Sequence, residues 1–151
     1  MDKPTHLIEF ETMLLGRYVG LHPPQYKHGG NHLDRSAYTL LSRIDMQGPM
    51  SIGELGEAFG LDTSTLSRQT SAMVNSGLVQ RISDPDGGMA RKFRITDEGM
   101  RRLGADRAGK VDGLDRVVAD WEPEDVATFA MWLRRFNSDV EKLAGRPWPR
   151  T

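Results

Sequence analysis

Three observations predict a mainly α (α+β) fold built around a winged helix-turn-helix. Two short amphipathic helical segments follow one another with only a few residues around Gly60 between them, which is the spacing of a helix-turn-helix. Two strand-like segments, 78–83 and 89–96, come next and enclose an Asp-Pro-Asp-Gly-Gly turn, as expected of a β-hairpin. Long amphipathic segments precede and follow this unit, so helices should account for most of the chain.

Composition restricts the class of protein. The chain has 151 residues, the size of one domain, with 20 basic and 21 acidic side chains and no cysteine. The lack of cysteine excludes a disulfide framework, a cysteine-ligated zinc finger and a thiol nucleophile. The near-zero net charge argues against a simple polycation. No apolar run reaches the ~18 residues of a membrane span and no signal peptide opens the sequence, so we expect a cytoplasmic protein without a membrane partner.

The first third of the chain predicts two helices joined by a loop. A helix is expected over 5–20, where apolar residues occupy one broad side. Residues 20–32 combine two prolines with several glycines and histidines, a composition that interrupts regular structure. Asp34 then has the position of an N-cap. The helix that it begins has an apolar stripe of Tyr38, Leu40, Leu41 and Ile44.

The helix-turn-helix begins at recognisable capping residues. Ser51 and Glu54 have the spacing of a capping box, in which the hydroxyl and the carboxylate each accept a backbone N–H bond from the other residue. Gly60 suits the end of this first helix, and Asp62 suits the N-cap of the second.

The last third predicts two long helices, the first capped by Thr96 and the second running from Pro123 to about Ala144. Their apolar seams are longer than a small winged unit can cover, so we expect flanking dimerisation helices; four-helix packing within one chain is the alternative. We divide the chain into residues 1–33 (N-terminal dimerisation helix and loop), 34–96 (the winged unit) and 97–151 (linker helix and C-terminal dimerisation helix).

The second helix of the helix-turn-helix has a polar face suited to nucleic acid. Small hydroxyl side chains let a helix approach base edges, and one arginine can form two hydrogen bonds with guanine. No carboxylate occurs from Thr63 to Ser83. The DNA-contact candidates on this helix are Ser64, Thr65, Ser67, Arg68 and Ser71.

Positive charge is concentrated in the same region. Residues 63–110 contain nine basic and five acidic side chains, a net charge of +4, whereas the rest of the chain has a net charge of −5. In the second predicted strand, alternation directs Phe93 inward and Lys92 and Arg94 outward, toward solvent or phosphate. With Arg91, these two residues are the DNA-contact candidates of the hairpin.

The segment SIGELGEAFGLDTSTLSRQTSAMVNSGLV, with FRITDEG after the hairpin, resembles the multiple-antibiotic-resistance-regulator (MarR) family. The order of elements is similar over the whole chain. The resemblance implies a homodimer that binds a pseudo-palindromic double-stranded DNA operator, with one recognition helix in each major groove and the wings in the minor groove. It also implies a transcriptional repressor that a small ligand relieves.

Carried over residue by residue, the resemblance assigns DNA contacts to Ser64, Thr65, Ser67 and Arg68, and a phosphate contact to Ser51 at a helix start. The wing departs from the family pattern. The family commonly has an Asp-x-Arg motif whose arginine enters the minor groove, and this chain has Gly87, Gly88 and Met89 there. Arg91 is the nearest substitute; the other interpretation is a wing that contributes only backbone contacts.

The resemblance also places a ligand pocket where the dimerisation helices meet the winged unit. Its candidate walls are Leu14, Tyr18, Tyr38, Leu41 and Met46, although such side chains at helical spacing are more often plain core.

Three other interpretations concern metal binding, catalysis and protein interaction. All four histidines, including His6, lie in the first 32 residues, and the three of the loop, His22, His28 and His32, suggest a divalent-metal site. Their spacings fit no recognisable ligand set, so we expect neither metal nor cofactor. An enzyme is not expected, because the sequence has no nucleophile elbow, metal-binding His pair or phosphate-binding loop. The altered wing motivates the main alternative function, a dimeric winged-helix protein-interaction module that does not recognise DNA sequence.

Overall fold

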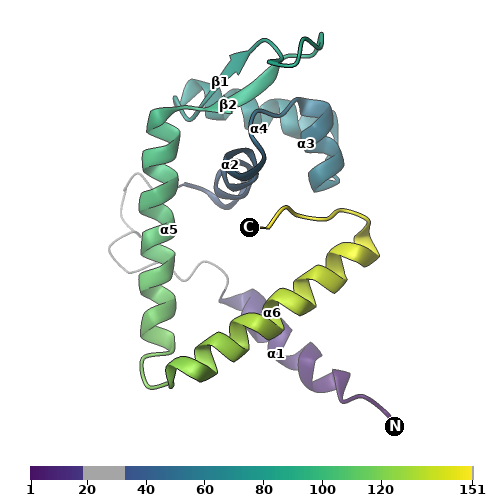
Figure 1. Ribbon diagram of the computed structural model, residues 1–151, viewed down its shortest axis with the longest axis vertical. Coiled ribbons are helices and arrows are strands. Elements are labelled where there is room, and N and C mark those ends of the chain that lie inside the picture. The colour runs from purple at the N-terminus through teal and green to yellow at the C-terminus, as the bar shows by residue number, and fades with distance from the viewer. Residues whose placement is uncertain (19–32, 151) are drawn as a thin grey trace.

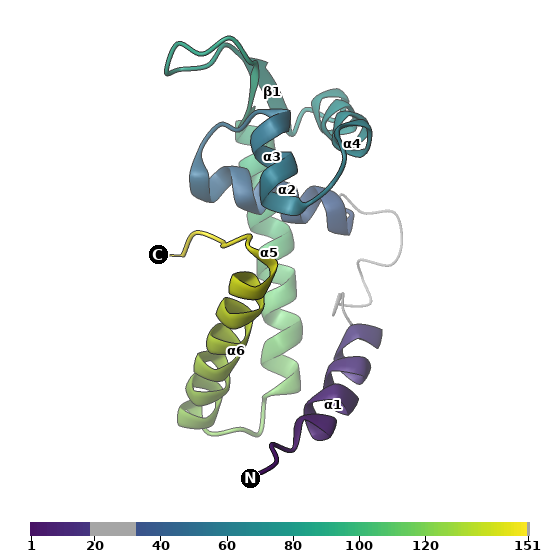
Figure 2. The ribbon, with the colours of Figure 1, turned by 90° about the vertical axis from the view of Figure 1, so that its right-hand side faces the viewer.

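The computed structural model describes residues 1–18 and 33–150. The winged unit lies at one end of an elongated molecule, α5 runs along most of its length, and α1 and α6 lie at the other end (Figures 1 and 2). The elements are α1 (Thr5–Arg17), α2 (Arg35–Gln47), α3 (Ile52–Phe59), α4 (Thr63–Asn75), β1 (Val79–Ile82), β2 (Lys92–Ile95), α5 (Asp97–Val117) and α6 (Pro123–Ala144).

The predicted N-caps are confirmed, and they determine where the helices of the winged unit begin. The capping box at α3 is complete: the Glu54 N–H donates to Ser51 Oγ at 3.1 Å, and the Ser51 N–H donates to Glu54 Oε1 at 3.3 Å. Gly60 ends α3 in the left-handed conformation, with φ of 65°. The remaining caps are the side chains of Asp34, Asp62 and Thr96, which accept N–H bonds at the starts of α2, α4 and α5.

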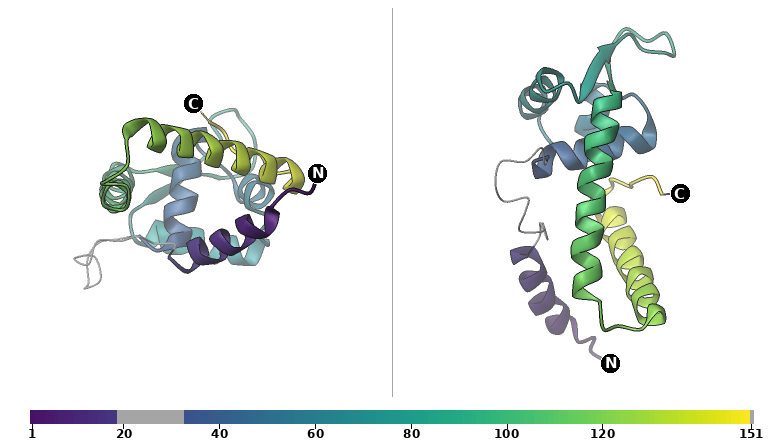
Figure 3. Two further views of the ribbon diagram at one scale, coloured as in Figure 1. Left: turned by 90° about the horizontal axis from the view of Figure 1, so that it is seen from below. Right: turned by 90° about the vertical axis from the view of Figure 1, so that its left-hand side faces the viewer.

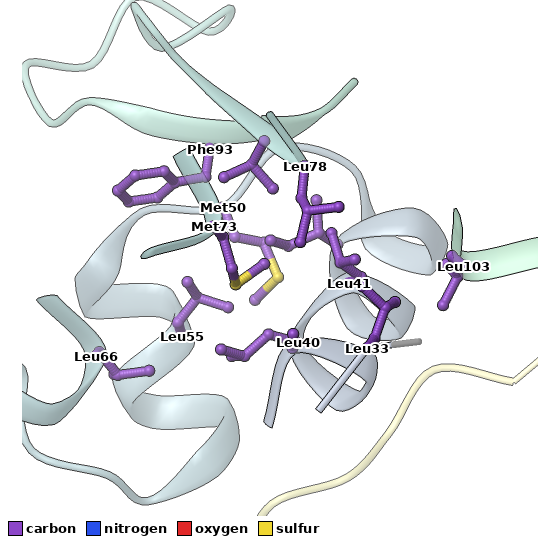
Figure 4. Packing of buried hydrophobic residues seen from close by; sticks show 13 residues of the cluster. Leu33, Leu40, Leu41, Met50, Leu55, Leu66, Met73, Leu78, Phe93 and Leu103 are labelled. Carbon is purple, nitrogen blue, oxygen red and sulfur yellow. The ribbon is translucent and has the colours of Figure 1, made fainter. Parts of the chain in front are cut away.

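One hydrophobic core holds the winged unit together (Figure 4). Leucines of α2, α3 and α4 pack beneath the hairpin, and Val79 and Phe93 of the hairpin complete this core. Leu103 is the contribution of α5, which fixes the start of this long helix against the unit. The most deeply buried side chains are Leu40, Leu41, Ile44, Met50, Leu55, Leu66, Thr70 and Leu103.

The wing is a two-stranded antiparallel hairpin in which Val79 pairs with Ile95 and Ile82 pairs with Lys92. The strands are shorter than predicted, because residues 83–91 form the turn rather than continuing the ladder. Met50 adds an isolated bridge to Phe93, with backbone N···O distances of 3.2 and 2.8 Å. The loop between α2 and α3 is therefore held against the hairpin.

The two terminal helices contain no buried residue. Helix α1 ends at Arg17, earlier than the predicted 5–20, and residues 19–20 lie outside the described part of the chain. In Figure 3 the two helices lie on different sides of the molecule's lower end, and an apolar groove of about 400 Å³ between them is lined by side chains of both. The apolar seam of α5 is also mostly exposed: Leu103 is buried, whereas Met100, Val111 and Leu114 are exposed.

Candidate nucleic-acid interface

Helix α4 has one buried face and one polar face. Leu66, Thr70 and Met73 are buried against the core. The Thr70 hydroxyl donates to the Leu66 carbonyl oxygen at 2.7 Å, so this polar group is satisfied within the helix. The predicted contact residues lie away from the core: Ser64 and Arg68 are exposed, whereas Thr65, Ser67 and Ser71 are partly exposed.

The start of α4 is preorganised by its own capping residue. The Asp62 carboxylate accepts the Thr65 N–H at 2.7 Å and the Ser64 hydroxyl at 3.2 Å. These hydrogen bonds, those of Thr65 first, hold the pKa of Asp62 below its ordinary value. Arg68 Nη2 donates to Thr65 Oγ1 at 3.4 Å. This long, exposed hydrogen bond leaves the guanidinium available to exchange partners with a nucleic acid.

Arg81 belongs to the same surface, although sequence reasoning did not single it out. Its Nη2 donates to Ser71 Oγ at 3.3 Å, and its guanidinium carbon lies 5.6 Å from the centroid of the Phe93 ring. The contact joins β1 to the polar face of α4. The hairpin register could have identified Arg81, because this residue pairs directly with Phe93 on the neighbouring strand.

Two predicted DNA-contact residues, Ser51 and Lys92, make contacts within the protein instead. The Ser51 residue is only 8% exposed and its hydroxyl caps α3. Lys92 is less exposed than predicted: its side chain is 14% exposed, and Nζ lies 3.0 Å from Glu54 Oε1 and 3.6 Å from Asp84 Oδ1. The reason is that α3 and the wing turn place two carboxylates beside this strand position. Arg94 is exposed as predicted, and its Nη2 donates to Gln80 Oε1 at 2.9 Å.

The wing turn carries no side chain equivalent to the family's minor-groove arginine. The Asp86 N–H donates to Asp84 Oδ1 at 2.8 Å, and Gly87 has a φ of 85°. Later in the same turn, Met89 and Arg91 are both exposed. Arg91 is therefore the first basic side chain after the tip.

The five predicted ligand-pocket residues do not form one accessible wall in the single chain. Leu41 is fully buried in the core, so it cannot line an open pocket. Tyr18 and Met46 are exposed, Leu14 is half-buried, and the Lys110 ammonium lies 4.6 Å from the centroid of the Tyr38 ring.

A different cavity, of about 350 Å³, lies between the start of α2, helix α4 and helix α5. Arg68 lines it, and so does Gln69, whose buried Oε1 has no hydrogen-bond partner within the described residues. Apolar walls come from Leu33, Ala37, Met73 and Leu78.

The three histidines that suggested a metal site, His22, His28 and His32, lie outside the described residues, whereas His6 belongs to them. Within residues 1–18 and 33–150, no cluster of three metal-ligating side chains occurs. In the same part of the chain, no helix combines the length and the hydropathy that a membrane crossing requires.

The helix pair, the hairpin and the polar face of α4 define the chain as a winged helix-turn-helix protein of the DNA-binding class. The MarR family model matches residues 33–87. Over 137 residues the chain is 37% identical to YxaD of Bacillus subtilis, an uncharacterized HTH-type transcriptional regulator, covering 90% of this chain and 94% of that protein. The chain belongs to the MarR family of DNA-binding transcriptional regulators.

Solved structures show the same fold. A MarR family protein from Bacillus stearothermophilus superposes with a TM-score of 0.72 at 19% identity, covering 93% of this chain and 99% of that one. PcaV from Streptomyces coelicolor, solved with its natural ligand, superposes with a TM-score of 0.63 at 23% identity, covering 93% of this chain and 98% of that one. Wild-type MarR from E. coli superposes with a TM-score of 0.65 at 16% identity, covering 90% of this chain and 98% of that one.

Proposed function

We propose that this chain acts as a homodimeric, sequence-specific repressor that binds a pseudo-palindromic DNA site and is released by a small ligand. The observation that carries the proposal is the exposed, carboxylate-free face of α4. It is accompanied by three exposed guanidinium groups on the hairpin, of which that of Arg81 reaches Ser71 on α4. In the dimer, two copies of α4 enter major grooves about one duplex turn apart, roughly 34–36 Å.

The chemistry of this surface separates specificity from affinity. Arg68 is the candidate for a bidentate contact with guanine, and the neighbouring hydroxyls of Ser64 and Ser67 suit base edges or phosphates. Arg81, Arg91 and Arg94 are exposed cations on the hairpin, so they suit phosphate contacts that position the protein without selecting a sequence. Ser51 and Lys92 are left out of this contact surface because of their burial and ion pairs.

The exposed apolar side chains of α1 and α6 are the evidence for the proposed homodimer. The accessible surface of the single chain is 10805 Å², whereas a compact monomer of 16.9 kDa exposes about 7,700 Å² by the usual scaling. The surplus includes aromatic and aliphatic side chains on both terminal helices. Association of two copies through α1 and α6 would remove this apolar surface from water. These side chains include Ile8, Phe10, Met13, Phe129, Trp132 and Phe136.

The cavity behind α4 is the ligand site that the geometry supports best. It combines apolar walls with Arg68 and with a Gln69 carbonyl oxygen that has no hydrogen-bond partner in the described part of the chain. This lining suits a small amphipathic anion that also donates a hydrogen bond. Because Arg68 lines the cavity and also belongs to the DNA-contact surface, a ligand that binds this guanidinium competes with DNA for it.

The test is fluorescence anisotropy with a duplex enriched from random sequence by the purified protein and with a scrambled duplex. We expect a clear preference for the enriched duplex and a steep loss of affinity with salt. Equal, weak and salt-insensitive binding to both duplexes would instead support the alternative of a protein-interaction module.

A further inference from the structure

The C-terminal tail, residues 145–150, returns from the end of α6 to the winged unit. Figures 1 and 2 show this segment passing beside α2 and α3. The Trp148 ring meets the Phe59 ring of α3 edge to face, with centroids 5.5 Å apart and an interplanar angle of 87°. The Arg43 guanidinium of α2 lies 5.0 Å from the centroid of the Trp148 ring. One tryptophan therefore contacts two helices of the winged unit.

The carboxylate of Glu141, on α6, holds the outer half of the tail. Glu141 Oε1 accepts the Trp148 N–H at 2.7 Å and Arg150 Nη1 at 2.8 Å. The hydrogen bonds from Arg150, the largest influence, hold the pKa of Glu141 below its ordinary value. The carboxylate is thus charged at neutral pH, and charge-assisted hydrogen bonds of this kind are the stronger ones. They fix the chain direction on both sides of the tryptophan.

The tail also touches the turn of the helix-turn-helix. A Cβ atom at Gly60 would lie 2.8 Å from the Arg146 guanidinium carbon, so the arginine packs directly on this glycine. Arg43 Nη1 donates to the Pro147 carbonyl oxygen at 3.4 Å. Gly60 is the C-cap of α3 and precedes α4 by only a few residues. A displacement of the tail therefore changes the packing at Gly60, close to the start of α4.

Without the tail, the described residues connect α6 to the winged unit mainly through α5. Helix α5 packs on α2, and the main helix contacts of the winged unit join α2, α3 and α4; α6 has no comparable packing on them. A connection through one helix alone leaves the winged unit free to rotate and bend relative to α6 about the end of α5. A second connection, from α6 to α2 and α3, restricts both.

We propose that the tail is a positioning strap: through Trp148 it fixes the orientation of the winged unit relative to α6 and so determines the separation of the two recognition helices in the dimer. This proposal rests on the proposed homodimer. Trp148 is a positioning residue in this account, since it acts through α2 and α3 and does not touch DNA.

The absence of cysteine makes a direct distance measurement simple. A thiol introduced as Asn75→Cys, at the exposed end of α4, carries a nitroxide, and pulsed electron paramagnetic resonance measures the label-to-label distance in the dimer. We expect one narrow distance distribution with the intact tail and a broader or shifted one in Trp148→Ala. Trp148→Phe retains an aromatic ring against Phe59 and should restore the narrow distribution. Arg150→Ala, at an exposed anchor, is a milder second variant that should broaden the distribution.

The outcomes are distinguishable. Narrow, superimposable distributions in all four proteins would overturn the strap while leaving the dimer intact. No dipolar coupling in the parent would overturn the dimer itself, and the strap with it. A second readout uses enriched duplexes whose half-sites are moved apart by inserted base pairs. We expect Trp148→Ala to lose about five- to tenfold in preference for the correct spacing, whereas a merely destabilised protein would lose binding to all spacings equally.

Discussion

Gly99, in the first turn of α5, tests whether this helix is joined to the hairpin as described. A Cβ atom at this position would lie closer to the Leu78 carbonyl oxygen than any real contact permits, and 2.9 Å from Ile95 Cγ1. The same carbonyl accepts the Thr96 N–H at 3.0 Å. In Gly99→Ala the helix must move away from β1. Overpacking of this kind costs about 1–3 kcal/mol, and weakening the hydrogen bond costs about 1 kcal/mol more.

The gain in helix propensity from glycine to alanine offsets about 1 kcal/mol of this cost. The net expectation is a loss of about 1–3 kcal/mol in the free energy of unfolding. Gly104 provides the matched control, because it lies in the same helix and a Cβ atom there meets nothing within 4 Å. Gly104→Ala should therefore stabilise the protein by about 0.5–1 kcal/mol. Urea unfolding monitored by circular dichroism, at equal protomer concentrations, measures both. If Gly99→Ala proved as stable as Gly104→Ala, the close packing of α5 on the hairpin would be refuted.

Four further predictions concern DNA, charge and assembly. Arg68→Ala should cost about 1–3 kcal/mol per half-site and relax specificity at one base pair; anisotropy that is unchanged on enriched and scrambled duplexes would exclude Arg68 from base recognition. Arg94→Ala should weaken binding to all sequences and reduce the salt slope by about 1 per half-site, so an unchanged slope would argue against a phosphate contact. Burial raises the pKa of Glu54, but the hydrogen bond from Lys92, with those of Ser51, outweighs it and lowers the pKa overall; the resulting stabilisation is present above the unfolded-state value of about 4.3 and is lost as pH falls through the lower, folded-state pKa. The difference in unfolding free energy between the parent and Glu54→Gln should consequently shrink from pH 7 toward strong acid, and a difference independent of pH would contradict the Lys92 pairing. Phe136→Glu, on the exposed apolar face of α6, should give monomers by sedimentation velocity with unchanged helical content, whereas a persistent dimer would place the interface elsewhere.

Local chemistry explains why most of the fold was predictable. Asp34, Ser51, Asp62 and Thr96 each cap a helix through a backbone N–H within a few residues, so their role follows from sequence spacing alone. The apolar periodicity of α4 likewise identified its buried face before any tertiary contact was known.

The features that sequence did not predict depend on contacts between distant segments. Lys92 is largely covered, although alternation predicts an exposed side chain, because Glu54 on α3 pairs with its ammonium. Arg81 joins the surface of α4 only through the strand register. The docking of the tail depends on Arg43, about a hundred residues earlier in the chain. Periodicity and capping rules contain no information about such pairs.

In the proposed complex, two copies of α4 enter successive major grooves of one symmetric DNA site. Enrichment of duplexes from a random-sequence library by the purified protein, followed by sequencing, tests it most directly. We expect an inverted repeat whose half-site centres are about one turn apart, roughly 10–10.5 base pairs. A pool that fails to enrich, or that enriches a single unrepeated motif, would contradict the claim.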